Sequence, residues 1–166
     1  MKNFLTTLTV IFLFSFILLF AISYNYDKNY IDYCNNNTDC ILELINDGEN
    51  YKLCQFANDS DSCFTTISMK SKNFDICNFV TNRSECLFQN AFKYDNIDLC
   101  KKIDSQDNCV FSIALKNNKI ELCNNAIDKD RCFYSYALKV KDIKMCEKSE
   151  KYKKVCRYEL LNETNT

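Results

Sequence analysis

Apolar positions recur along this chain at a fixed interval of 23 residues. The interval is clearest in the cysteines, because the gaps between them alternate between 14 and 9 residues from Cys40 to Cys146. A period of this length is typical of repeat proteins, in which one small unit is stacked many times. Four complete units begin at Cys54, Cys77, Cys100 and Cys123, with a shortened unit at Cys34 and a divergent one at Cys146.

The first cysteine of each unit lies in a pattern that predicts a helix of about two turns. Apolar residues stand three positions before it (Tyr51, Phe74, Ile97, Ile120, Ile143), one before it (Leu53, Ile76, Leu99, Leu122, Met145) and three after it (Ala57, Val80, Ile103, Ala126). The segment follows residues whose side chains cap helix N-termini, namely Asn50, Asn73, Asn96 and Asp142.

The second cysteine opens a longer predicted helix. Two residues before it stands a preferred N-cap, which is Thr38, Asp61, Ser84, Asp107 or Asp130. Apolar residues follow the cysteine directly (Phe64, Leu87, Val110, Phe133), and the small Ala91, Ala114 and Ala137 come about one turn later. Lysines close the helix in register at positions 70, 93, 116 and 139, where a cation complements the helix dipole. Because strand alternation is absent, we expect an all-α, right-handed α-solenoid of about five and a half helical hairpins.

Helices this short are marginal alone, so the hairpins need a covalent staple. Pairing within units uses every thiol, and the odd spacings at both ends then fall inside the pairs. This scheme joins Cys34–Cys40, Cys54–Cys63, Cys77–Cys86, Cys100–Cys109, Cys123–Cys132 and Cys146–Cys156. A shifted scheme starting at Cys40–Cys54 leaves Cys34 and Cys156 without partners, and connectivity is not settled by spacing alone.

Metal binding and redox chemistry are the alternative uses of twelve cysteines. The chain has no C-x-x-C and no histidine, and its gaps do not match zinc-finger or zinc-ribbon spacing. The missing C-x-x-C also argues against a thiol–disulfide oxidoreductase. We therefore expect neither a metal site nor a cofactor.

Residues 4–23 form an apolar segment without charge, preceded by Lys2. Such a segment is typical of an export signal or of a membrane anchor, and the cysteines favour delivery of the rest to an oxidising compartment. The predicted organisation is a signal peptide or anchor over 1–23, a linker over 24–33, the cysteine-rich repeat domain over 34–161 and a polar tail over 162–166. The expected location is extracytoplasmic, either membrane-anchored through 4–23 or secreted.

Charge and composition exclude several functions. The 21 basic and 22 acidic residues are intermixed and give a net charge of −1, which does not favour a nucleic-acid partner. No histidine is present as a general base, and the acidic residues occupy cap and surface positions, so we expect no catalytic residues. Candidate N-glycosylation sequons begin at Asn36, Asn58, Asn82 and Asn162.

The stapled two-helix unit from Cys34 to Leu161 resembles secreted cysteine-rich repeat proteins of the Sel1-like and tetratricopeptide type. It also resembles short cysteine-repeat proteins exported by archaea and bacteria. The resemblance implies a bond between the two helices of a hairpin, as in Cys77–Cys86 and Cys100–Cys109, and binding of a protein or peptide on the repeat surface. Partner specificity is then expected at Gln55, Asn78, Lys101 and Asn124, which differ between units. A metal-binding or redox protein, or a secreted enzyme or inhibitor on this scaffold, is the alternative.

Overall fold

A computed structural model describes residues 15, 32–45 and 48–163, and these residues fall into two compact units. Unit 1 ends at Phe79 and unit 2 begins at Val80. The described part of each unit consists of α-helices and 3-10 helices joined by turns, without a strand. This confirms the predicted all-α repeat of hairpins.

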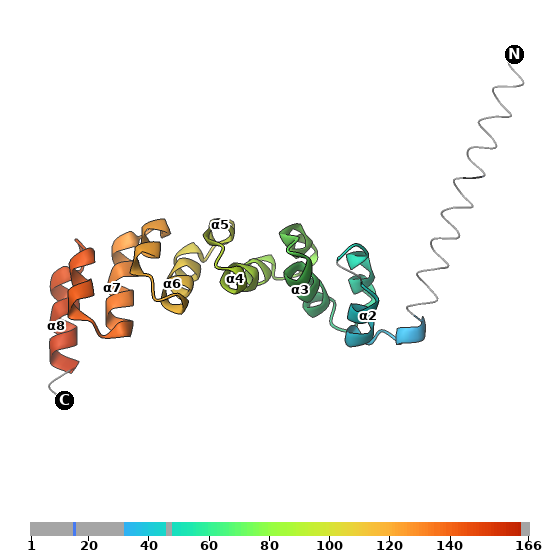
Figure 1. Cartoon of the computed structure of the whole chain (residues 1–166), viewed down its shortest axis with the longest axis horizontal. Helices are drawn as coiled ribbons and strands as arrows, with labels where there is room; N and C mark the ends of the chain where they lie inside the picture. The colour runs from blue at the N-terminus through green and yellow to red at the C-terminus, as the bar shows by residue number, and fades with distance from the viewer. Residues whose placement is uncertain (1–14, 16–31, 46–47, 164–166) are drawn as a thin grey trace, which may run out of the picture. The chain divides into compact units, whose positions relative to one another are not determined.

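Unit 1 contains α2 (Thr38–Leu44), the 3-10 helix η1 (Tyr51–Phe56), α3 (Ser60–Ser71) and the 3-10 helix η2 (Phe74–Phe79). Each element packs against its neighbours in sequence, and α3 contacts both η1 before it and η2 after it (Figure 1). A second helix therefore lies between the first helix of its own hairpin and that of the next.

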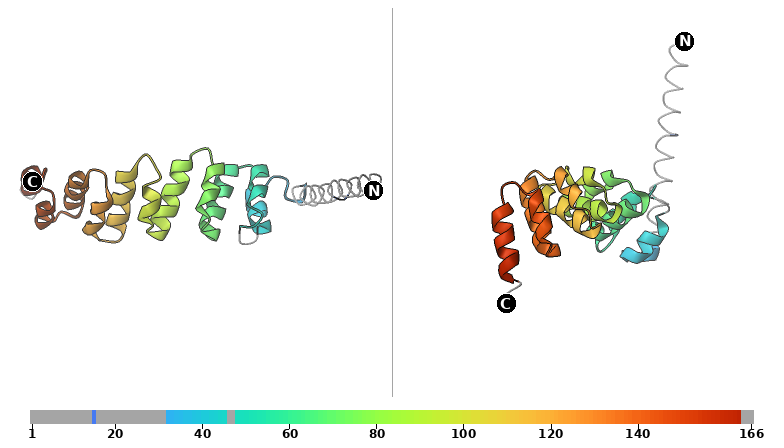
Figure 2. Two further views of the ribbon diagram at one scale, coloured as in Figure 1. Left: turned by 90° about the horizontal axis from the view of Figure 1, so that it is seen from above. Right: turned by 60° about the vertical axis from the view of Figure 1, so that its left-hand side comes forward.

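Unit 2 continues the same order. Its elements are α4 (Arg83–Tyr94), α5 (Ile97–Cys100), α6 (Gln106–Lys116), η3 (Ile120–Asn125), α7 (Lys129–Val140), η4 (Ile143–Lys148) and α8 (Lys153–Glu163). Here α7 contacts η3 of its own hairpin and η4 of the next, and it also packs on α6 and α8. The views in Figure 2 agree that α7 (orange) and α8 (red) lie side by side.

The first helices are mostly 3-10 in type. The sequence places apolar residues three before the cysteine, at the cysteine and three after it, and a 3-10 helix has three residues per turn. These residues therefore align on one side, where Ile120, Cys123 and Ala126 are all buried. The predicted caps at Asn96 and Asp142 are confirmed, because their carboxamide and carboxylate oxygens accept the N–H of Asp98 at 3.1 Å and of Lys144 at 2.9 Å. The cap predicted at Asn50 is wrong, since its side chain makes no capping bond.

The second helices form as predicted but begin earlier. The N-caps of α3, α4 and α7 are Asp59, Asn82 and Asp128, each accepting a backbone N–H three residues later at 2.9–3.0 Å. Asn37 caps α2 in the same way, and Ser105 precedes α6 without a capping bond. The caps predicted at Thr38, Asp61, Ser84, Asp107 and Asp130 are therefore wrong, since these residues lie within the first turn. At the starts of α3, α4, α6 and α7, two residues that favour the N-cap position stand two positions apart. At α6 and α7 the second of them, Asp107 or Asp130, bonds to the following hairpin.

The core runs along the inner side of the second helices. The column five residues after the second cysteine holds Ser68, Ala91, Ala114 and Ala137, each 0 % exposed. Because small side chains stand at this column, the next hairpin can approach the helix backbone closely. In unit 1 the Cys77 sulfur lies 3.7 Å from the Ser68 hydroxyl.

The second helices α3, α4, α6 and α7 are each followed within two residues by a residue in the left-handed backbone conformation. Lys72, Asp95, Asn118 and Lys141 have φ between 53° and 56° and recur every 23 residues. The turn places the following N–H on the helix end, as when Asn96 donates to the Ala91 carbonyl at 2.9 Å. These turns reverse the chain into the next first helix.

Three of the predicted segments lie wholly or partly outside the described residues. The predicted signal or anchor segment over 1–23 is outside them apart from Ser15, and most of the linker over 24–33 and the end of the tail are outside as well. No helix formed by the described residues is long and apolar enough to cross a membrane.

Candidate interaction surface

All twelve cysteines are among the described residues, and none of them is free. Five bonds join cysteines as the within-unit scheme expects, with Cα–Cα distances of 5.4–5.7 Å: Cys34–Cys40, Cys54–Cys63, Cys100–Cys109, Cys123–Cys132 and Cys146–Cys156. Cys77 and Cys86 are disulfide-bonded too. Disulfide-bonded cysteines of this number indicate an oxidising environment.

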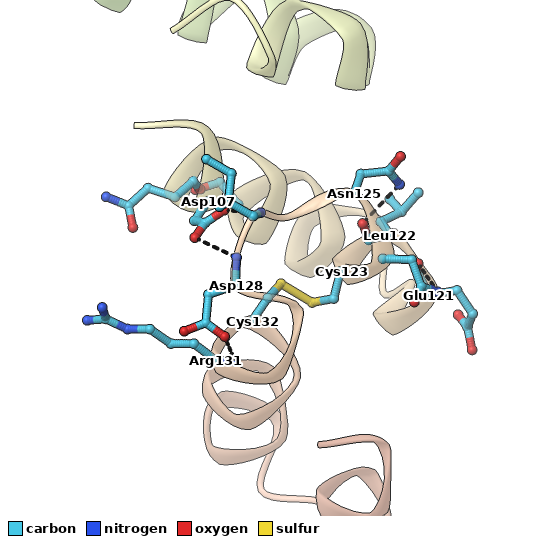
Figure 3. Close-up of a disulfide and its surroundings, with 12 residues drawn as sticks. Asp107, Glu121, Leu122, Cys123, Asn125, Asp128, Arg131 and Cys132 are labelled. Atoms are coloured by element: carbon cyan, nitrogen blue, oxygen red, sulfur yellow. Dashed lines mark hydrogen bonds between the residues drawn. A yellow bond between two sulfur atoms is a disulfide. The ribbon is translucent and has the colours of Figure 1, made fainter. Parts of the chain in front are cut away.

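The carboxylate two residues before the second cysteine bonds to the following hairpin. Asp107, in the first turn of α6, accepts the N–H of Ile127 at 2.6 Å and of Asp128 at 3.2 Å. Figure 3 shows Asp107 next to Asp128, where α7 begins and the Cys123–Cys132 bond ties it to η3. Asp107 therefore fixes the start of α7, and this use of the side chain explains why it does not cap its own helix.

The same clamp recurs at the next junction. Asp130 Oδ1 accepts the N–H of Glu150 at 2.6 Å, the N–H of Lys151 at 3.2 Å and the Ser149 hydroxyl at 3.2 Å. The bond from the Lys151 N–H contributes most to holding the pKa of Asp130 below its ordinary value, and desolvation opposes it. In unit 1 the Thr38 hydroxyl accepts the Asp59 N–H at 3.1 Å. The repeated polar residue at this position is therefore structural.

One of the repeated lysines, Lys116, also joins hairpins. Lys116 closes α6, but its ammonium donates to the Phe92 carbonyl at 2.5 Å and to Asp95 at 2.9 Å, both at the end of α4. Asn117 donates to the same Asp95 oxygen at 2.8 Å, and these two bonds, with Asn117 the larger cause, lower the pKa of Asp95. The sequence predicts that the lysine acts on the end of its own helix, whereas Lys116 bonds to the end of the preceding second helix.

The positions predicted for partner specificity are exposed. The residue directly after the first cysteine is Gln55, Asn78, Lys101, Asn124 and Glu147 in successive hairpins, and all five lie at the surface. The column therefore changes in charge and size from hairpin to hairpin without disturbing the core. Lys101 forms an ion pair with Asp98 at 2.7 Å, and Glu147 pairs with Lys153 and Arg157.

A pocket of about 400 Å³ opens beside this column in unit 2. Its lining consists of Glu121, Asn124, Lys129, Asp130, Phe133, Lys148 and Glu150. Asn124 was predicted from the sequence as a specificity position, and the other lining residues were not. An alignment of the hairpins could have found them, because Lys129, Lys148 and Glu150 stand where the preceding junction has Gln106, Asn125 and Ile127.

The four sequon asparagines are exposed. Asn36 and Asn58 meet through the backbone, where the Asn58 N–H donates to the Asn36 carbonyl at 2.8 Å. Asn82 uses its amide oxygen to cap α4 at 3.0 Å from the Glu85 nitrogen, while N-glycosylation modifies the amide nitrogen. Glycosylation at these positions stays a prediction.

Within residues 32–45 and 48–163, no three side chains of His, Cys, Asp or Glu are grouped so that they could hold a metal ion. Searches with the whole sequence find no matching protein-family model, curated protein or solved structure. What the geometry supports is the class of protein, a disulfide-stapled helical repeat.

Proposed function

We propose that this chain is a non-catalytic protein-interaction module that works outside the cytoplasm, secreted or tethered to a membrane through residues 4–23. The observation that supports the proposal is that polar residues which repeat between hairpins and polar residues which differ between them lie in different places. Those that repeat, such as Asp107, Asp130 and Lys116, bond one hairpin to the next. Those that differ, such as Lys101 and Asn124, are exposed in register.

A surface of this kind suits binding. Repeat proteins use a constant interior as scaffold and exposed, variable positions as a contact surface. The resemblance to Sel1-like and tetratricopeptide-type repeats also implies a protein or peptide ligand. Catalysis has less support, because Asp95, Asp107 and Asp130 are already held by hydrogen bonds at hairpin junctions.

The test is site-specific photo-crosslinking of the full-length chain in the membranes and extracytoplasmic fraction of its source cells. A photoreactive amino acid is placed at Gln55, Lys101 or Asn124, and at the exposed Lys154 as a control. The proposal expects one defined protein adduct from the variable column and none from position 154. No adduct, or the same adducts from position 154, would count against it.

Mass spectrometry tests the competing metal or redox function. Alkylation of the native protein is expected to modify no cysteine, and alkylation after reduction is expected to modify twelve, since every cysteine is disulfide-bonded. Alkylation without reduction, or zinc that co-purifies, would favour the alternative.

A further inference from the structure

The pocket between the last two hairpins of unit 2 is lined by charges of both signs. The hairpin of η3 and α7 contributes two acids and one base, Glu121, Asp130 and Lys129. The next hairpin contributes Lys148 and Glu150. The ring of Phe133, itself 8 % exposed, forms part of the wall between these charges.

At the preceding junction, a hydrogen bond joins two of the corresponding positions. There Gln106 donates to the Asn125 carbonyl at 3.0 Å, across from one hairpin to the next. Lys101 pairs with Asp98 on the same first helix. The positions that correspond to Gln106 and Asn125 are Lys129 and Lys148. No hydrogen bond joins these two residues in the described part of the chain.

Four of the five charged groups that line the pocket, those of Glu121, Lys129, Lys148 and Glu150, make no hydrogen bond or ion pair to a described residue. The fifth, Asp130, is held by three donors.

We infer that the pocket binds a protein segment that carries both acidic and basic side chains. This inference rests on the proposed function and specifies its ligand. The lining carries three carboxylates and two ammonium groups. A ligand of a single sign, such as a nucleic acid or a polyamine, is therefore disfavoured, because it would meet at least two repelling groups. An extended segment with lysine and glutamate satisfies both signs, and its aliphatic stems pack on the Phe133 ring.

Nuclear magnetic resonance titration of the full-length, oxidised chain in detergent micelles tests the inference. The probes are capped pentapeptides with one lysine and one glutamate at varied spacing, compared with peptides bearing two lysines, two glutamates or two glutamines. We expect saturable amide shifts at Asn124, Phe133 and Glu150 with the mixed peptides, at least about tenfold tighter than with the others.

A matched pair of variants makes the result specific. The pocket variant combines Glu121→Gln, Lys129→Gln, Lys148→Gln and Glu150→Gln, which leaves the net charge unchanged, and it should weaken mixed-peptide binding about tenfold or more. The control changes two exposed charges of the preceding hairpin, Lys102→Gln with Asp104→Asn, and should bind as the unaltered chain does. Unperturbed amide shifts elsewhere in α7 verify folding.

Three outcomes would overturn the inference: no saturable shift with any mixed peptide, equal binding by the pocket variant, or the same shifts with free lysine and glutamate. The last would mean a small-molecule site. If these occur while photo-crosslinking at Lys101 still captures a defined protein, the proposed function stands and only the pocket assignment fails.

Discussion

Removing the Cys123–Cys132 bond gives the sharpest test of the staple argument. The perturbation is the double variant Cys123→Ala with Cys132→Ala. The two residues are separated by nine positions, so the bond closes a ten-residue loop. Loop entropy for that length contributes about 2.7 kcal/mol to the free energy of unfolding. The two sulfurs are 0 % and 4 % exposed, and losing each costs about as much as one buried methylene, roughly 0.8 kcal/mol.

The sum is about 4 kcal/mol, which is a large share of the stability of a small repeat unit. Native-state hydrogen exchange is the appropriate assay, because repeat arrays open locally and one melting point averages over them. Amides of α7 such as those of Tyr136 and Ala137 should exchange at least about a hundredfold faster, which corresponds to the entropic part alone.

Ile113→Val is the matched control. Ile113 is 0 % exposed in the neighbouring α6, and its truncation removes a buried methylene without altering a crosslink. It should cost about 0.5–1.5 kcal/mol, a change that the same assay resolves. If the double variant accelerates exchange in α7 by less than Ile113→Val does in α6, the staple argument is refuted.

Two further predictions concern the junctions. Asp130→Asn should lower the melting temperature at pH 7. Hydrogen bonds depress the pKa of Asp130 in the folded protein. The contribution of this carboxylate to stability is therefore present above the ordinary aspartate pKa of about 4 and is lost as the pH falls through the lower folded value. The difference from the unaltered chain should therefore shrink in thermal melts below about pH 4, and a difference independent of pH would contradict the clamp. Ala137→Leu should destabilise by about 1–3 kcal/mol in urea titrations through overpacking, whereas Ala137→Ser should cost less, since Ser68 occupies this column in unit 1; equal effects would contradict close packing.

Much of the fold could be predicted because each hairpin repeats the same sequence pattern. The cysteine spacing, the apolar columns and the small Ala91, Ala114 and Ala137 recur, so a chance match in one unit is averaged out. The type of the first helix was also implicit in the three-residue spacing around Cys123, although that spacing is short enough to suit either kind of helix.

Local preference could not decide between two capping residues two positions apart. Asp128 and Asp130 are equally good N-caps by residue type. The choice depends on the N–H groups of Glu150 and Lys151, which only the packed neighbour brings within reach of Asp130. The left-handed turns could not be predicted either. Lys72, Asp95 and Lys141 occupy positions where a glycine usually marks such a turn in the sequence.

The pocket was harder to predict from the sequence than the fold. Lys129 and Glu150 belong to different hairpins, and either one alone is an ordinary surface charge. Only the placement of η4 against α7 brings them to one pocket. Asn124 could be predicted because exposure and variability are both visible in a single column.

The order of the disulfides bears on how the protein matures. In each of the five bonds given above, a cysteine is joined to the cysteine that follows it in the sequence. On the proposed export into an oxidising compartment, the correct partner is then the next thiol to emerge, about ten residues later, and contact across such a loop takes roughly 10–100 ns. Oxidation in order of emergence yields the native pairs directly, so maturation needs no reshuffling step and a disulfide isomerase has little to correct.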